Sequence, residues 1–128
     1  MSDGTHKLLD VKALAQELRR FASERDWDQF HSPKNLVMAL TGEVGELAEV
    51  FQWATEDQSR MSASDPRTAQ AVRDEIADVT LYLVRLADVL GVDLDEAVRH
   101  KLALNAAKYP VDKVRGSSLK YNADGAAS

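Results

Sequence analysis

Apolar residues recur along the chain at helical spacing and mark out four segments. The first segment follows Asp10, a residue type that commonly caps a helix. Val11, Leu14, Leu18 and Phe21 come after it at steps of three or four residues. This spacing predicts an amphipathic helix that ends near residues 24–27.

The second segment, residues 33–55, carries two apolar stripes. Ser32 and Pro33 form a good helix start, because serine caps and proline tolerates the first helical position. A single packing partner cannot cover both stripes, which are separated by roughly 60° to 100° around the helix. The main stripe comprises Leu36, Leu40, Leu47, Val50 and Ala54, and the second comprises Val37, Val44 and Phe51.

The third segment, residues 66–90, repeats the cap-plus-proline start at Asp65-Pro66 and ends at Gly91. Residues 56–65 before it are polar and are expected to form an exposed loop. The segment also has two apolar stripes, so it is expected to be buried on two sides. Its main stripe comprises Val72, Ile76, Val79, Leu83, Leu86 and Leu90, and its second comprises Ala77, Leu81 and Val84.

The fourth segment opens with a capping-box pattern from Asp93 to Glu96 and stops before Pro110. Together the four segments predict an all-α, four-helix-bundle-like domain over residues 10–110. Residues 1–9 are expected to be a flexible start, and residues 111–128 an irregular tail.

The composition narrows the class of protein. A chain of 128 residues with 45% hydrophobic content can bury the core of one domain, and no cysteine is present for a disulfide or thiolate site. No apolar run is long enough for a membrane span or signal peptide, so we expect a cytoplasmic protein. The net charge of −5 argues against a nucleic acid polymer as partner.

Two carboxylate pairs lie inside the apolar segments, Glu43 with Glu46 and Glu75 with Asp78. Each pair is spaced i, i+3, which places both side chains on one face of a helix. Glu43 falls about 20° from the centre of its apolar stripe. A buried carboxylate without a counter-charge costs several kcal/mol, so the four residues are expected to hold a metal ion.

Oxygen-only ligation favours Mg²⁺, with Mn²⁺ as a substitute. The alternative interpretation is a solvated acidic face, the usual role of helical glutamates, and it fits Glu43 least well because of its place in the stripe. A di-iron bundle needs Glu-x-x-His pairs, and Glu96 to His100 has the wrong spacing.

Two further groups of residues are candidates for ligand contact. Residues 27–31 combine two aromatic side chains and a histidine that could stack on a planar ring, or could simply cover the end of the bundle. Lys101, Asn105 and Lys108 lie along one side of the fourth helix and could reach phosphate oxygens, or could be ordinary surface residues.

The acidic motifs resemble those of the MazG-like all-α nucleoside triphosphate pyrophosphohydrolases. Their signature is similar to E-E-x-x-E followed, after an insert, by E-x-x-D, and Gly42 stands here in place of its first glutamate. Within this superfamily the chain looks most like the dCTP pyrophosphatase branch. The supporting stretches are residues 21–40 (FASERDWDQFHSPKNLVMAL), Phe51-Gln52-Trp53, residues 81–84, residues 101–110 and residues 115–121.

The resemblance implies Mg²⁺-dependent cleavage of a deoxynucleoside triphosphate, dCTP or a modified dCTP, to the monophosphate and pyrophosphate. It implies that Glu43, Glu46, Glu75 and Asp78 hold Mg²⁺. The branch often has a substrate-contacting histidine where Leu18 stands here, which leaves the base preference open. The implied nucleotide pocket comprises Trp27, Asp28, Gln29, Phe30, His31, Trp53 and Tyr82.

The expected reaction uses an activated water, which Glu46 would orient or deprotonate. The alternatives are a pyrophosphohydrolase with a different base preference and a non-catalytic acidic helical module that binds a partner protein. Two apolar stripes on each of two helices also predict a homo-oligomer, because their exposed area would exceed what a monomer tolerates. A tetramer is favoured over a dimer, in line with the resemblance.

Overall fold

The computed structural model describes residues 10–118, and all regular structure within that range is helical. The predicted all-α class is confirmed, and each of the four predicted segments contains a long helix. In chain order the elements are α1 (Val11–Glu24), the 3₁₀ helix η1 (Asp28–Phe30), α2 (Pro33–Phe51), α3 (Glu56–Arg60), α4 (Ala69–Leu90), α5 (Leu94–Lys108) and α6 (Val111–Val114).

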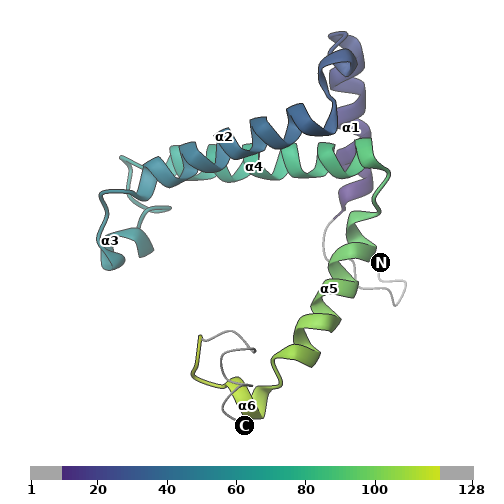
Figure 1. Ribbon diagram of the computed structural model, residues 1–128. Coiled ribbons are helices and arrows are strands. Elements are labelled where there is room, and N and C mark those ends of the chain that lie inside the picture. The colour runs from purple at the N-terminus through teal and green to yellow at the C-terminus, as the bar shows by residue number, and fades with distance from the viewer. Residues whose placement is uncertain (1–9, 119–128) are drawn as a thin grey trace, which may run out of the picture. The chain divides into compact units, whose positions relative to one another are not determined.

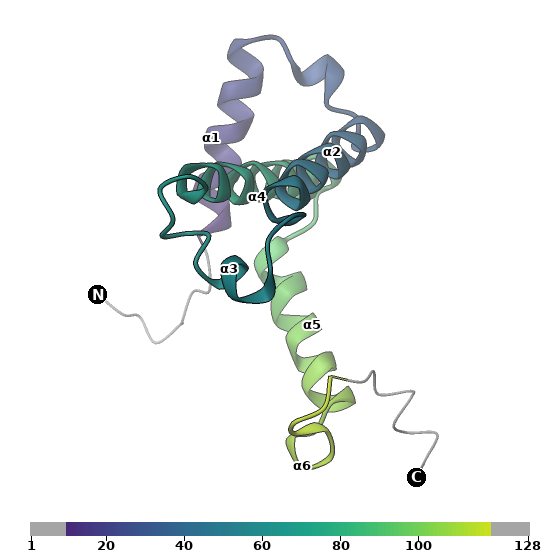
Figure 2. The same ribbon diagram turned by 90° about the vertical axis from the view of Figure 1, so that its left-hand side faces the viewer.

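The chain divides into two units between Val92 and Asp93. In the first unit, α2 and α4 lie side by side and antiparallel, with α3 beyond one end of the pair (Figure 1). Helix α1 crosses α4 steeply near the other end and packs against it (Figures 1 and 2). The buried apolar residues are Val11, Ala22, Leu36, Val72 and Val84, which come from all three long helices of this unit.

The predicted helix starts and stops are largely confirmed. The Asp10 carboxylate accepts a hydrogen bond from the backbone N–H of Ala13, and Ser32 Oγ accepts one from Asn35, each at 3.2 Å. Gly91 ends α4 with φ of +70°, a left-handed conformation that glycine adopts at little cost. These local signals fix where the long helices can begin and end.

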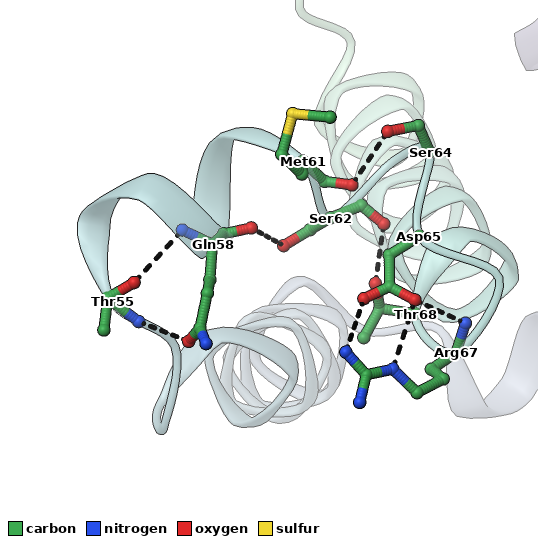
Figure 3. A network of polar contacts seen from close by, with 8 residues as sticks. All are labelled: Thr55, Gln58, Met61, Ser62, Ser64, Asp65, Arg67 and Thr68. Atoms are coloured by element: carbon green, nitrogen blue, oxygen red, sulfur yellow. Dashed lines mark hydrogen bonds and ion pairs between the residues drawn. The ribbon is translucent and has the colours of Figure 1, made fainter.

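The prediction that residues 56–65 form a loop was wrong, because α3 occupies the first half, although most of these residues are exposed as predicted. Thr55 and Gln58 form a reciprocal capping box: each side chain accepts from the other residue's backbone N–H, at 2.9 and 3.1 Å. Thr68 Oγ1 then donates to the carbonyl of Ser62 at 2.7 Å and closes the turn that follows (Figure 3). The segment is therefore an ordered turn.

The predicted start of the third helix at Asp65-Pro66 was also wrong, since α4 begins at Ala69. The Asp65 carboxylate accepts from the backbone N–H of Arg67 at 2.9 Å and pairs with its guanidinium at 3.0 Å (Figure 3). A hydrogen bond from residue i+2 occurs both in Asx turns and at helix N-caps, and here it belongs to a turn that precedes α4. At the other end of the insert, α2 stops at Phe51, four residues before the predicted end.

The apolar stripes of α4 face differently from the prediction. Val72 is buried as expected, but Ile76, Leu83 and Leu90 of the main stripe are 44–54% exposed. Val84, of the second stripe, is buried. The first unit therefore leaves a heptad-spaced line of large apolar side chains on α4 open, and Val37 and Val44 are likewise exposed on α2.

The second unit contains α5 and α6. Asp93 caps α5 by accepting from the backbone N–H of Glu96 at 3.0 Å, and α5 ends before Pro110 as predicted. The short α6 lies in the segment predicted to be an irregular tail. The flexible start predicted for residues 1–9 and the last ten residues of that tail lie outside the described residues. None of the described helices is both long enough and apolar enough to cross a membrane.

Candidate functional site

Three of the four predicted carboxylates meet between α2 and α4. Glu43 projects from α2, and Glu75 and Asp78 project from α4, one turn apart. One oxygen from each of the three lies within 4.8 Å of the other two. The antiparallel pairing of the two helices thus brings residues more than 30 positions apart into one acidic cluster, which we call the carboxylate trio.

The trio is electrostatically strained. Within residues 10–118, Oε2 of Glu43 and Oε2 of Glu75 are buried and have no hydrogen-bond partner. Burial, reinforced by the neighbouring Glu46 carboxylate, raises the pKa of Glu43 to about 7. Burial and Glu46 also raise the pKa of Glu75. A divalent cation would relieve the repulsion between these buried carboxylates. Because all the donor atoms are oxygens, the site fits Mg²⁺ or Mn²⁺.

Glu46, predicted both to bind metal and to activate water, is exposed and lies outside the trio. Its charge still raises the pKa values of Glu43 and Glu75, so its carboxylate lies close to the cluster. An adjacent carboxylate that is not itself buried in the cluster remains available to solvent water.

The turn between α1 and α2 carries the predicted aromatic residues. Asp26 adopts a left-handed φ of +55°, which aspartate tolerates, and the chain then winds into η1. The Trp27 ring packs edge-on against Phe21 with 5.7 Å between centroids, and against His31 with 6.5 Å. These contacts anchor the turn to the end of α1.

Arg85 of α4 binds two residues of this turn. Its side chain is only 9% exposed; Nε donates to His31 Nδ1 at 3.0 Å and Nη2 donates to the Asp28 carboxylate at 2.9 Å. Asp88 lies 3.5 Å from Nη1 of Arg85 and pairs with Arg19 of α1 at 2.7 Å. Burial, and secondly the Arg85 charge, lowers the pKa of His31.

A cavity of about 190 Å³ lies between this turn and α4. Trp27, His31 and Tyr82, all predicted to contact substrate, line it. Asp78 lines it too, so the cavity adjoins the carboxylate trio through a shared residue. The remaining lining residues are Leu18, Phe21, Leu36, Leu81 and Arg85.

The other predicted substrate residues do not line this cavity. Asp28 is held by Arg85, the Gln29 amide donates to the Asp26 carbonyl at 3.0 Å, and Phe30 is exposed. Trp53 is 88% exposed just beyond α2, near a second cavity of about 480 Å³ that α3 helps to form. Lys101 and Asn105 belong to α5 in the second unit.

Sequence reasoning did not single out Arg85. The available signal was one cation inside the apolar run from Leu81 to Leu86, where an arginine must find acidic or polar partners. Its partners on the turn lie 54 and 57 positions away, so the sequence alone did not reveal them.

Comparison with known proteins places this geometry in context. A model of the MazG-like family matches residues 39–123. The chain is 48% identical over 114 residues to dCTP pyrophosphatase 1 of Bos taurus, covering 89% of this chain. It spans 66% of the length of that relative, just under two thirds.

Two further proteins match over most of their length. The chain is 33% identical over 104 residues to protein YpjD of Bacillus subtilis, whose function is uncharacterized, and covers 86% of it. The crystal structure of a pyrophosphatase from Archaeoglobus fulgidus superimposes with a TM-score of 0.72 at 37% sequence identity, covering 83% of this chain and 97% of that one.

Proposed function

The chain belongs to the MazG-like family, and we propose that it is a nucleoside triphosphate pyrophosphohydrolase that converts dCTP to dCMP and pyrophosphate. The observation that carries the proposal is that a base-sized aromatic cavity and a buried carboxylate trio share Asp78. A nucleotide needs both parts at once, one for its ring and one to hold the cation that offsets the charge of its phosphates. The names of the bovine relative and of the archaeal structure support the same chemistry.

We propose Mg²⁺, or Mn²⁺ in its place, as the cofactor, held by Glu43, Glu75 and Asp78 with Glu46 as the fourth carboxylate. The buried oxygens of Glu43 and Glu75 without hydrogen-bond partners among the described residues support this donor set. When bound, the ion would offset phosphate charge and polarise a water for attack.

The protein groups then have distinct roles. Glu46, exposed beside the trio, would orient the attacking water and accept its proton. The water adds to phosphorus as the anhydride bond between the α- and β-phosphates breaks, and pyrophosphate leaves with the bonding electrons. Trp27, His31 and Tyr82 would hold the base. A contact of Lys101 and Asn105, on α5 of the second unit, with phosphate oxygens stays a prediction from the sequence.

The residues that line the cavity bear on base preference. Leu18 lines the cavity where the family resemblance implies a histidine, so one polar contact is replaced by an apolar one. This favours modified cytosines, or a wider range of bases, as additional substrates. The non-catalytic alternative needs the acidic residues exposed, and Glu43 and Glu75 each bury one oxygen.

We further propose a homo-oligomer, with a tetramer favoured over a dimer, that works in the cytoplasm on free nucleotides rather than on a nucleic acid polymer. The exposed apolar line Ile76, Leu83 and Leu90 supports association, and the net charge of −5 disfavours polyanion binding.

The direct test is a panel of all common ribo- and deoxynucleoside triphosphates with Mg²⁺, in which pyrophosphate and orthophosphate are both measured. We expect pyrophosphate and monophosphate in equal amounts, with dCTP among the best substrates. Orthophosphate as the sole product would identify a phosphatase and refute the proposal. Absence of turnover with every nucleotide would favour the non-catalytic alternative.

A further inference from the structure

We propose that Arg85 is a positioning residue that fixes His31 in the tautomer protonated at Nε2, so that the cavity offers a neutral hydrogen-bond donor to a carbonyl oxygen of the base. The part of this inference that concerns the base rests on the proposed function. The tautomer itself is a property of the free protein.

The direction of the hydrogen bond between Arg85 and His31 determines the tautomer of His31. An arginine guanidinium has only donors, so the 3.0 Å contact from its Nε requires His31 Nδ1 to be an acceptor. A neutral imidazole with an acceptor at Nδ1 carries its proton on Nε2. The lowered pKa of His31, caused by burial and by the Arg85 charge, agrees with a neutral ring.

Arg85 is itself held in place by its contacts. Its planar fork contacts His31 and Asp28 at once, and Asp88 lies near its third nitrogen. Arg19 of α1 donates to both carboxylate oxygens of Asp88, at 3.1 and 2.7 Å. A buried side chain with three such contacts has little freedom, which suits a group that must orient another.

The Nε2–H donor of His31 belongs to the aromatic part of the site. His31 lines the 190 Å³ cavity beside Trp27 and Tyr82, whose rings suit a planar base. The carboxylate trio, which would hold the cation that meets the phosphates, adjoins the cavity only through Asp78. A neutral donor on the aromatic side of the cavity therefore fits a base carbonyl better than a phosphate.

The tautomer is tested by ¹⁵N NMR of the histidine side chains without any nucleotide. Wild-type His31 should show an unprotonated Nδ1 and a protonated Nε2. Arg85→Met should yield a mixture of tautomers, and so should Arg85→Lys, which keeps the buried charge but lacks the fork. Arg19→Met is the matched control, because it removes a cation of the same network that does not touch His31. A protonated Nδ1 in the wild type would overturn the inference, whatever the variants do.

The functional arm is a double-mutant cycle with dCTP. Arg85→Met should raise KM about 10-fold with little change in kcat, the effect expected for one lost directed hydrogen bond. In a His31→Phe background, Arg85→Met should raise KM no further, because the two residues act as one. Equal effects in both backgrounds would show that Arg85 does not act through His31.

Product inhibition separates the base from the phosphates. In Arg85→Met, inhibition by dCMP should weaken as KM rises, while inhibition by pyrophosphate stays at the wild-type level. Weakened pyrophosphate inhibition alone would assign His31 to the phosphates and refute the base contact. If the wild type hydrolyses no nucleotide, the proposed function fails, and the NMR result still decides the tautomer.

Discussion

Glu43 is the residue at which the hydrophobic pattern and the chemistry of the chain conflict. Its position on α2 belongs to the inward face, yet it carries a carboxyl group whose pKa is raised to about 7. A leucine there would stabilise the unit through burial alone. A conflict of this kind is expected where function outweighs stability.

Activity should depend on the carboxylates of the trio. We expect Glu43→Gln and Asp78→Asn each to lower kcat/KM for dCTP at least about 100-fold with Mg²⁺ present, because each removes a charge from the proposed ion site. Glu49→Gln is the control, since Glu49 is exposed on the same helix outside the trio. Circular dichroism should show that all three variants are folded. Wild-type turnover in Glu43→Gln at saturating substrate would exclude Glu43 as a metal ligand.

The raised pKa of Glu43 should also make the stability of the metal-free protein depend on pH. A folded-state pKa raised from 4.5 to about 7 means that the folded protein binds the proton more tightly, so the contribution of Glu43 is present below pH 4.5 and is lost as pH rises to about 7. We expect this loss to be about 1 kcal/mol, because partial exposure screens it.

The measurement is urea unfolding in chelator-containing buffer on either side of that pH window. Glu43→Gln should lose this part of the pH dependence and should be at least as stable as the wild type above pH 7, whereas Glu49→Gln should follow the wild type. Added Mg²⁺ should restore stability to the wild type alone. Parallel pH curves for the wild type and Glu43→Gln would contradict the raised pKa.

At the scale of elements, local sequence signals predicted the features that depend on contacts between nearby residues, such as helix starts and ends. Asp10 and Ser32 specify helix starts, and Gly91 a helix end, through contacts within four residues. The i, i+3 pairs likewise predicted that carboxylates would share a face. The predicted start at Asp65-Pro66 was wrong because an aspartate before a proline can serve a turn or a cap, and here the chain makes a turn before α4 begins at Ala69.

What depends on pairing between distant elements was harder to predict. The partners of Arg85 lie on a turn more than 50 residues away. The outward orientation of Ile76 and Leu83 depends on which face of α4 meets α2, and a helix with apolar residues on two sides does not specify this. Leu18 of α1 enters the cavity for the same reason, through the crossing of α1 over α4.

The α2 to α3 junction offers a further test at this scale. Trp53 is 88% exposed, so removing its ring should cost little stability. Trp53 does not line the 190 Å³ cavity, so its predicted contact with the nucleotide requires the nucleotide to extend beyond that cavity. Stacking on a base is worth about 1–3 kcal/mol, and we therefore expect Trp53→Ala to weaken nucleotide binding by about 5- to 150-fold. Met61→Ala is the control, because Met61 is an exposed apolar side chain near the same second cavity. Unchanged KM values for every nucleotide in Trp53→Ala would assign Trp53 to packing in the assembly.

At the scale of the whole molecule, the first unit leaves several large apolar side chains of α2 and α4 exposed. Ile76, Leu83 and Leu90 follow one heptad line on α4, and Val37 and Val44 follow another on α2. Heptad spacing keeps such residues on one side of a helix, which is the pattern by which helices of separate chains pack together. Two lines on two helices can support two different interfaces, as a dimer of dimers requires.

This leads to a prediction about assembly. Light scattering at micromolar concentration should give a mass that is a multiple of 14.1 kDa, with four copies favoured over two. Leu83→Glu should lower that mass, because burying an unpaired carboxylate in an apolar interface costs several kcal/mol. Ala71→Glu adds the same charge at an exposed position of α4 away from the apolar line, and should leave the mass unchanged. A wild-type mass near 14.1 kDa would refute the oligomer, and an unchanged mass in Leu83→Glu would place the interface elsewhere on the chain.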